Sequence, residues 1–286
     1  MEWVERLNQA VNYIEENLSG TIKYDVAAQL ACCSTFHFQR MFSYIAGIPL
    51  SEYIRRRRMT AAAVDLQTTK TKIIDIALQY GYESPTSFNR AFQSVHGISP
   101  SAARAEGVSL KAFPRISITI SIKGDVEMNY KIEQKEAFRI VGVREQMEME
   151  MEGAFARVPI FWQETIQAGM IPNILGMLNQ PPHGLLGVSS STSGTEFDYY
   201  IAVASDKPTP QGMDEFEVPA CTWAVFECIG PMPRTIQELQ KRIITEWLPT
   251  SGYEYADAPD MEVYTDGDQQ SPSYRSEVWL PVVRKQ

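Results

Sequence analysis

Glu277 is a carboxylate within an otherwise mainly apolar and aromatic stretch, Tyr274 to Val283. Side chains alternate between the two faces of a strand, so Glu277 and Trp279 share one face. An aromatic ring offers its π face to a cation, and a carboxylate supplies the opposite charge. The pair therefore predicts a site for an organic cation. Other aromatic candidates for the wall of this cleft are Tyr199, Trp162 and Trp223.

Other interpretations of these residues stay open. Glu277 and Arg275 also fit an exposed strand pair, although we favour ligand contact for Glu277, and each tryptophan also fits a core position. In a different class of function, Glu277 and Tyr199 would be the acid and base of a small-molecule hydrolase. The sequence has no glycine-rich phosphate loop, no HExxH and no Ser/His/Asp set, and its four cysteines and three histidines lack metal-ligand spacing. We expect a binding protein rather than an enzyme, without cofactor or metal.

Basic residues gather in the first half of the chain, although the net charge is −9. Residues 20–105 hold ten basic and five acidic residues (+5), whereas residues 111–286 hold 15 basic and 25 acidic residues (−10). A basic segment beside an acidic one is typical of a DNA-binding domain joined to an acidic partner domain. The run Arg55–Arg58 is either a solvated helical face or a contact to DNA phosphates.

The basic segment contains an internal repeat with a period of 50 residues. Aligning residues 21–51 with residues 71–101 gives 11 identical pairs among 31 positions without a gap, including Ser34/Ser84 and Arg40/Arg90. One supersecondary unit is therefore expected to occur twice.

Each copy has the pattern of two short helices joined by a tight turn. In the first copy Tyr24–Leu30 is a helix, Ser34 is the N-cap of the next helix, and Gly47 ends it. The corresponding parts of the second copy are Ile73–Tyr80, Ser84 and Gly97. The pattern predicts two helix-turn-helix modules, joined by a helix over Leu50–Thr68.

Four segments resemble the DNA-binding domain of the AraC/XylS family, in the arrangement of its Rob-like branch: STFHFQRMF (34–42), EYIRRRRM (52–59), IDIALQYGY (74–82) and SFNRAF (87–92). The resemblance covers about residues 5–105. It implies that the DNA-binding positions are Phe36, Gln39 and Arg40 in the first module and Thr86, Ser87 and Arg90 in the second. Pro85 and Thr86 depart from the family's paired glutamines, so Arg90 is expected mainly to contact phosphate.

The second half shows two similar rounds of strand and helix patterns. The first round is Tyr130–Glu145, a helix over Ala154–Ala168, Leu185–Ser189 and Phe197–Ala204; the second is Phe216–Ile229, a helix over Thr235–Trp247, Met261–Tyr264 and Tyr274–Val283. They predict an α+β domain of duplicated β-α-β-β units, with helices on one sheet face and a cleft on the other. The whole chain is then multidomain, with an all-α N-terminal double helix-turn-helix domain.

Between the two halves, isoleucines alternate with serine and threonine from Ile116 to Ile122. This stretch is an ordered connector or an edge strand of the second domain, and we favour the edge strand.

Three segments of the second half resemble the GyrI-like effector-binding family: FDY (197–199), WAVFECIG (223–230) and SEVWLPV (276–282). The resemblance covers about residues 126–286 and implies a cleft, between the two halves of the domain, for small amphipathic or cationic organic molecules. Glu277 matches the family's acidic position on the last strand. The ligand-binding residues expected from the resemblance and the chemistry are Glu277, Trp279, Tyr199, Trp162 and Trp223.

These observations predict a one-component transcription regulator. Its expected parts are a DNA-binding domain at 1–108, a linker or edge strand at 109–125, and an effector-binding domain at 126–286. Expected partners are double-stranded promoter DNA, a small-molecule effector and RNA polymerase. No apolar run is long enough to cross a membrane and no signal-peptide pattern begins the chain, so a cytoplasmic protein is expected. The alternative is a GyrI-like domain acting as a hydrolase or a ligand-sequestering module.

Overall fold

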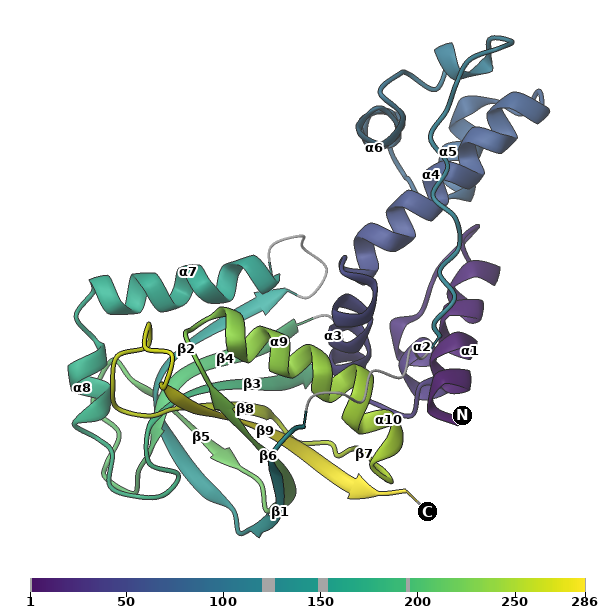
Figure 1. The fold of residues 1–286 in the computed structure, drawn as a ribbon. Helices are drawn as coiled ribbons and strands as arrows, with labels where there is room; N and C mark the ends of the chain where they lie inside the picture. Colours follow the sequence, from purple (N-terminus) through teal and green to yellow (C-terminus); the bar gives the residue numbers. More distant parts are fainter. Residues whose placement is uncertain (1, 120–126, 149–153, 194–195, 286) are drawn as a thin grey trace.

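A computed structural model describes residues 2–119, 127–148, 154–193 and 196–285. The chain forms a helical half and a half built on a curved antiparallel sheet (Figure 1). This arrangement confirms the predicted fold class.

The helical half contains the two predicted modules. Its elements are α1 (Glu2–Glu16), α2 (Tyr24–Leu30), α3 (Thr35–Ala46), α4 (Leu50–Thr68), α5 (Ile73–Gln79), α6 (Pro85–His96) and the short 3₁₀ helix η1 (Ala102–Arg104). The hydroxyls of Ser34 and Ser84 accept backbone N–H groups in the first turns of α3 and α6. Gly47 and Gly97 end these helices in the left-handed conformation, which glycine adopts without strain. The sequence repeat is therefore a structural repeat.

The sheet half consists of strands with helices inserted between them. Its strands are β1 (Tyr130–Lys135), β2 (Phe138–Glu148), β3 (Leu185–Ser193), β4 (Glu196–Ala204), β5 (Asp214–Val218), β6 (Cys221–Ile229), β7 (Tyr253–Tyr255), β8 (Asp260–Tyr264) and β9 (Arg275–Arg284). Its helices are α7 (Ala154–Gln167), α8 (Ile171–Leu175), α9 (Arg234–Arg242), the π-helical turn η2 (Ile243–Trp247) and α10 (Leu248–Thr250).

The sheet joins two β-α-β-β units, β2-α7-β3-β4 and β6-α9-β8-β9. Among the described residues the strand order is β1-β6-β9-β8-β3-β4-β2-β5, so the two units meet where β3 pairs with β8. Strand β1 precedes the first unit but pairs with β6 of the second, and β5 precedes the second unit but pairs with β2 of the first. The strand that precedes each unit in the chain is therefore an edge strand of the other unit.

The two sheet faces differ in what covers them. Helices α7 and α9 lie over the same face, here named the helix-covered face, and the opposite face is named the open face (Figure 1). Phe161 of α7 packs with Tyr199, and Ile236 of α9 belongs to the same core as Phe226. Strand alternation therefore assigns Tyr199 and Phe226 to the helix-covered face.

Three sequence predictions need correction here. The pattern over Tyr130–Glu145 is two strands, β1 and β2, with different partners, and the pattern over Phe216–Ile229 is likewise divided into β5 and β6. The edge strand favoured for Ile116–Ile122 is absent from residues 116–119, and residues 120–122 lie outside the described part. There Ile116 N–H donates to the Tyr53 hydroxyl, and Ile118 N–H donates to Asn8 Oδ1, so helices bind this backbone.

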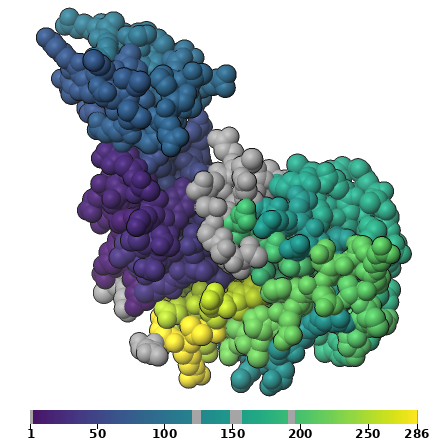
Figure 2. Space-filling model, turned by 180° about the vertical axis from the view of Figure 1, so that it is seen from behind, coloured from purple at the N-terminus to yellow at the C-terminus, as the bar shows by residue number. Residues whose placement is uncertain are grey.

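The first module and the sheet half share one hydrophobic core. Leu7 of α1 and Phe42 of α3 belong to the same buried cluster as Trp247 and Val282. The second module has a separate core, which includes Met59, Phe88 and Phe92, and it projects as a lobe of its own (Figure 2). The boundary in packing thus falls within α4, not between the helical half and the sheet half.

Within the described residues, no helix has the length and apolarity that a membrane span requires. The same residues contain no cluster of three or more His, Cys, Asp or Glu side chains suited to a metal ion.

Candidate effector cleft and DNA-reading helices

Helix α6 of the second module exposes the side chains expected to meet DNA. Thr86, Ser87 and Arg90 are all exposed, and α6 packs inward through Phe88 and Phe92. An α-helix that projects its free face from a small lobe fits the major groove of B-DNA.

Helix α3 of the first module is placed differently. Phe36 is 5% exposed and Gln39 6%, and the Arg40 side chain is 11% exposed. None of these three expected base-reading residues faces solvent, and Phe36 and Arg40 contact the sheet half. The equivalent helices of the repeat thus have opposite environments.

Asp260, at the start of β8, binds α3 through two basic side chains. Arg40 Nη1 donates to Asp260 Oδ2 at 2.9 Å, and His37 Nε2 lies 3.7 Å from Asp260 Oδ1. The His37 ring stacks on Tyr255 with 4.1 Å between the centroids. Burial by itself would raise the pKa of Asp260, but Arg40 and His37 outweigh burial and hold this pKa below its ordinary value. The contact is therefore a charged one.

Phe36 extends this contact into the core of the first β-α-β-β unit. Its ring centroid lies 5.3 Å from that of Phe197, and it shares a buried cluster with Phe161 and Tyr199. Helix α3 therefore contacts the strands of both units, through Phe36 on one and Asp260 on the other.

Beside α3, the helix-covered face holds a carboxylate among aromatic rings. Glu262 of β8 accepts a hydrogen bond from the Tyr264 hydroxyl at 2.7 Å, and Trp162 donates to the Tyr199 hydroxyl at 2.9 Å. The Trp162 and Tyr264 rings lie edge to face, 5.2 Å apart. We name Glu262, Tyr264, Tyr199 and Trp162 the acid–aromatic cluster.

The charge of Glu262 acts on both tyrosines of this cluster. Burial, and then Glu262, raise the pKa of Tyr199 and that of Tyr264 well above the ordinary value. Both side chains therefore stay neutral phenols; the Tyr264 hydroxyl donates to Glu262, and the Tyr199 hydroxyl accepts from Trp162. A chain of polar contacts ties the cluster to α3, because Tyr44 donates to Gln240 at 2.5 Å and Gln240 donates to Glu262.

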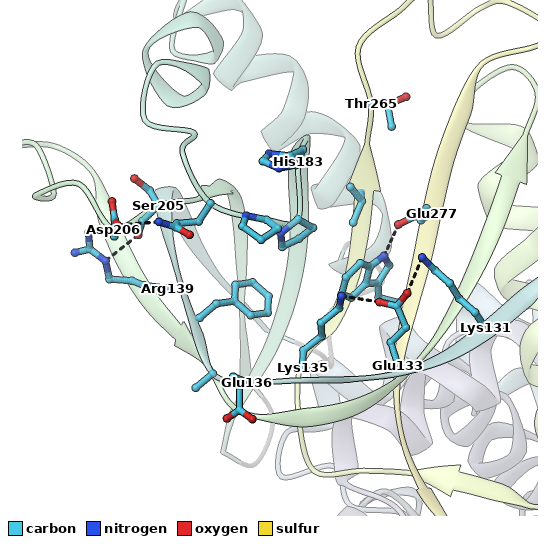
Figure 3. Close-up of a pocket in the computed structure, with 17 residues that line it drawn as sticks. Lys131, Glu133, Lys135, Glu136, Arg139, His183, Ser205, Asp206, Thr265 and Glu277 are labelled. Atoms are coloured by element: carbon cyan, nitrogen blue, oxygen red, sulfur yellow. Dashed lines mark hydrogen bonds and ion pairs between the residues drawn. The ribbon is translucent and has the colours of Figure 1, made fainter.

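A hollow lies on the open face (Figure 3). It has a volume of about 760 Å³, and Glu277, Trp279 and Lys135 are among its lining residues. Trp279 Nε1 donates to Glu277 Oε2 at 2.7 Å, and Lys135 Nζ lies 5.6 Å from the Trp279 ring centroid. Charged groups of both signs line the same hollow: Lys131 and Glu133 lie on the side of Glu277, and Arg139 lies on the far side (Figure 3).

The structure does not bring the five expected ligand residues together. Glu277 and Trp279 line the open-face hollow, and the fully buried Trp223 packs edge to face on Trp279. Tyr199 and Trp162 lie on the helix-covered face. The prediction of a single cleft is therefore wrong. In the β8–β9 ladder Glu277 is opposite Val263 and Glu262 is opposite Val278, so the two glutamates lie on opposite faces of the sheet. The period-two argument that selected Glu277 applies equally to Glu262 within Asp260–Tyr264, so the signal was present but not used.

The arginine run on α4 is engaged within the protein. Arg55 and Arg56 pair with Glu52, and Arg57 Nη2 lies 2.7 Å from Glu15 Oε2. Arg58 donates to backbone carbonyls, at 3.1 Å for Leu18 and 2.7 Å for Gly20. Contacts of these side chains to phosphate would replace or share existing partners.

Comparisons with known proteins agree with both halves. The family described as a GyrI-like small molecule binding domain matches residues 128–283, and a helix-turn-helix family matches residues 27–106. The HTH-type transcriptional activator AarP of Providencia stuartii is 45% identical over 98 residues, covering 34% of this chain and 73% of AarP. The regulatory protein SoxS of Escherichia coli K12 is 36% identical over 98 residues, covering 34% of this chain and 92% of SoxS.

A solved structure shares the fold of the second half. It is that of SAV2435 bound to tetraphenylphosphonium, with 27% identity and a TM-score of 0.51, and it covers 55% of this chain and 94% of that one.

Fold, modules and cluster together define a DNA-binding regulator with a small-molecule binding domain. The chain belongs to the AraC family of transcription regulators and carries a GyrI-like effector-binding domain.

Proposed function

We propose that the effector of this regulator is a lipophilic organic cation, bound on the helix-covered face at the acid–aromatic cluster. The observation that carries the proposal is Glu262, a half-buried carboxylate bordered by Tyr264, Tyr199 and Trp162. A carboxylate removed from water needs a countercharge, and neutral rings stabilise a cation by roughly 0.5–2 kcal/mol each. The ligand named for the related SAV2435 has this chemistry.

The open-face hollow supports the same ligand less well. Lys135 Nζ lies 5.6 Å from the centroid of the Trp279 ring, the ring that a cation would use. A ligand cation there would face the charge of Lys135 and of Lys131, which also lines the hollow.

The hydrolase alternative required Glu277 and Tyr199 as an acid–base pair. The two side chains lie on opposite faces of the sheet, so the geometry does not support this pair. The named relatives are transcription regulators, and AarP is named an activator. We therefore propose that this chain controls transcription through binding alone. We also propose that it contacts RNA polymerase, as an activator would.

The test compares two variants that each remove one carboxylate charge. Glu262→Gln is expected to weaken tetraphenylphosphonium at least tenfold, about 1.4 kcal/mol, because the countercharge is lost while the side-chain shape stays. Binding of the neutral triphenylphosphine oxide should change little. Isothermal titration calorimetry measures both ligands on the full chain.

Glu277→Gln is the matched control, and it should leave both ligands unchanged. If Glu277→Gln weakens the cation and Glu262→Gln does not, the effector binds on the open face. Equal losses for the charged and the neutral ligand in Glu262→Gln would make Glu262 structural.

A further inference from the structure

We propose that α3 is an autoinhibitory segment: Arg40 takes the place of a cationic effector beside the acid–aromatic cluster, and effector binding releases α3 to DNA. The proposal rests on the proposed function for the identity of the effector. It assigns to α3 two mutually exclusive positions, one on the sheet and one in a major groove.

The first argument is the burial of the reading face. A recognition helix contacts base edges through residues near its N-terminus, and these must project from the protein. In α3, Phe36 and Arg40 contact the sheet half, and Gln39 is buried. Helix α3 cannot enter a groove while these contacts persist.

The second argument is the chemistry around Arg40. Its guanidinium pairs with Asp260 at 2.9 Å and lies 5.7 Å from the Tyr44 ring centroid and 5.9 Å from that of Phe36. An acid and two aromatic rings are the surroundings expected for a bound organic cation. Glu262 is tied to this group through Gln240 and Tyr44. The Arg40 guanidinium thus lies among an acid and aromatic rings that would also bind an external organic cation.

The third argument comes from the repeat. Arg40 and Arg90 are equivalent positions of the two modules, yet Arg90 is exposed. Packing against the sheet, rather than the fold of a module, therefore buries Arg40. Because α6 stays exposed, the closed protein retains one helix able to meet DNA.

The two positions of α3 define a closed and an open state, and an effector can shift the equilibrium between them. A ligand shifts a two-state equilibrium only by its differential affinity for the two states. A cation that needs the space and the charges used by Phe36 and Arg40 binds the open state better. A buried ion pair adds little net stability over a well-packed alternative, so the closed state is reversible.

The test removes the anion of the contact and leaves α3 unchanged. Asp260→Asn in the full chain should bind DNA at least tenfold more tightly than the original chain without any ligand. The probe is a duplex selected from a random library by the Asp260→Asn chain, and affinity is measured by fluorescence anisotropy at one fixed salt concentration. Adding tetraphenylphosphonium should tighten DNA binding by the original chain and change the variant less.

Asp198→Asn is the matched control. Asp198 is also a buried aspartate paired with an arginine, Arg144, at 3.3 Å, but it is on the open face and does not contact α3. It should leave DNA affinity unchanged. Phe197→Ala, which removes the ring packed on Phe36, is the second variant and should act like Asp260→Asn.

Hydrogen exchange reports on α3 directly. Backbone amides of α3 should exchange faster in Asp260→Asn, and in the original chain with tetraphenylphosphonium, while those of α6 stay constant. Unchanged DNA affinity in both folded variants would overturn autoinhibition even if the cation binds. Tighter DNA binding by the variants without any binding of the cation would keep autoinhibition and overturn the proposed effector. Weaker DNA binding upon addition of the cation would show that effector and α3 do not compete.

Discussion

Gly187 is the residue of the helix-covered face that leaves room beside Glu262. A Cβ at this position would overlap the Tyr199 hydroxyl and lie 3.2 Å from Glu262 Oε2. The backbone here has no positive φ that demands glycine, so space alone explains the residue. A methyl group would have to displace the ring that carries the hydroxyl.

This gives a prediction for Gly187→Ala. The displaced Tyr199 should lose its hydrogen bond from Trp162, and tetraphenylphosphonium should bind roughly tenfold more weakly, about 1.4 kcal/mol. Tryptophan fluorescence follows the first effect and calorimetry the second. An unchanged affinity in a variant with altered fluorescence would place the ligand away from Tyr199.

At the residue scale the sequence identified types better than positions. It predicted a carboxylate among aromatic rings, but two strands carry such a carboxylate, Glu262 and Glu277. Which of the two meets Tyr199 and Trp162 depends on strand pairing over long sequence distances, which alternation within one strand does not contain. The same limit explains why Arg40 was expected to be exposed.

Among the elements, helix boundaries follow local chemistry closely. Helix α2 and helix α4 begin and end as predicted, and α3 and α6 begin after their serine caps and end at glycine. Strand boundaries were less accurate, because alternation continues across the breaks after Lys135 and Val218. The exchange of β1 and β5 between the units is a property of the assembled sheet and has no local signal.

The cap of α6 gives a prediction for Ser84. Its hydroxyl accepts the N–H groups of Thr86 at 3.2 Å and Ser87 at 3.5 Å. Ser84→Ala should destabilise the second module by about 1 kcal/mol, whereas Ser84→Gly should cost only a few tenths of that amount. Native-state hydrogen exchange at Phe88 and Phe92, which lie in the module's own core, measures the difference. No measurable cost in Ser84→Ala would mean that the cap bond contributes nothing.

For the whole molecule, the shared core is the feature that the sequence did not reveal. A charge difference between the halves suggested two independent domains, yet Leu7 and Phe42 are buried together with Trp247 and Val282. Apolar patterning shows that these positions are buried but not against which part of the chain.

Cutting the chain after residue 110 therefore has two expected results. Loss of the shared core should lower the midpoint of thermal unfolding of the first module by about 10 °C or more, the shift that roughly 2 kcal/mol produces in a domain of this size. Both modules remain, so salt-dependent DNA binding should persist below that temperature. Circular dichroism and anisotropy titrations measure these results.

The second module supplies the internal reference for this experiment. Its core around Phe88 and Phe92 lies within the fragment, so amide exchange in α6 should match that of the full chain. Identical unfolding midpoints for fragment and full chain would show that the shared core adds nothing to the first module.

The contact between Arg40 and Asp260 joins residues 220 positions apart in the chain. At ribosomal speeds of about 5–20 residues per second, roughly 10–45 s separate the synthesis of the two residues. During that interval α3 has been made but its acidic partner has not. A newly made chain therefore passes through a period in which α3 lacks this acidic partner, and the contact can form only after Asp260 has been synthesised.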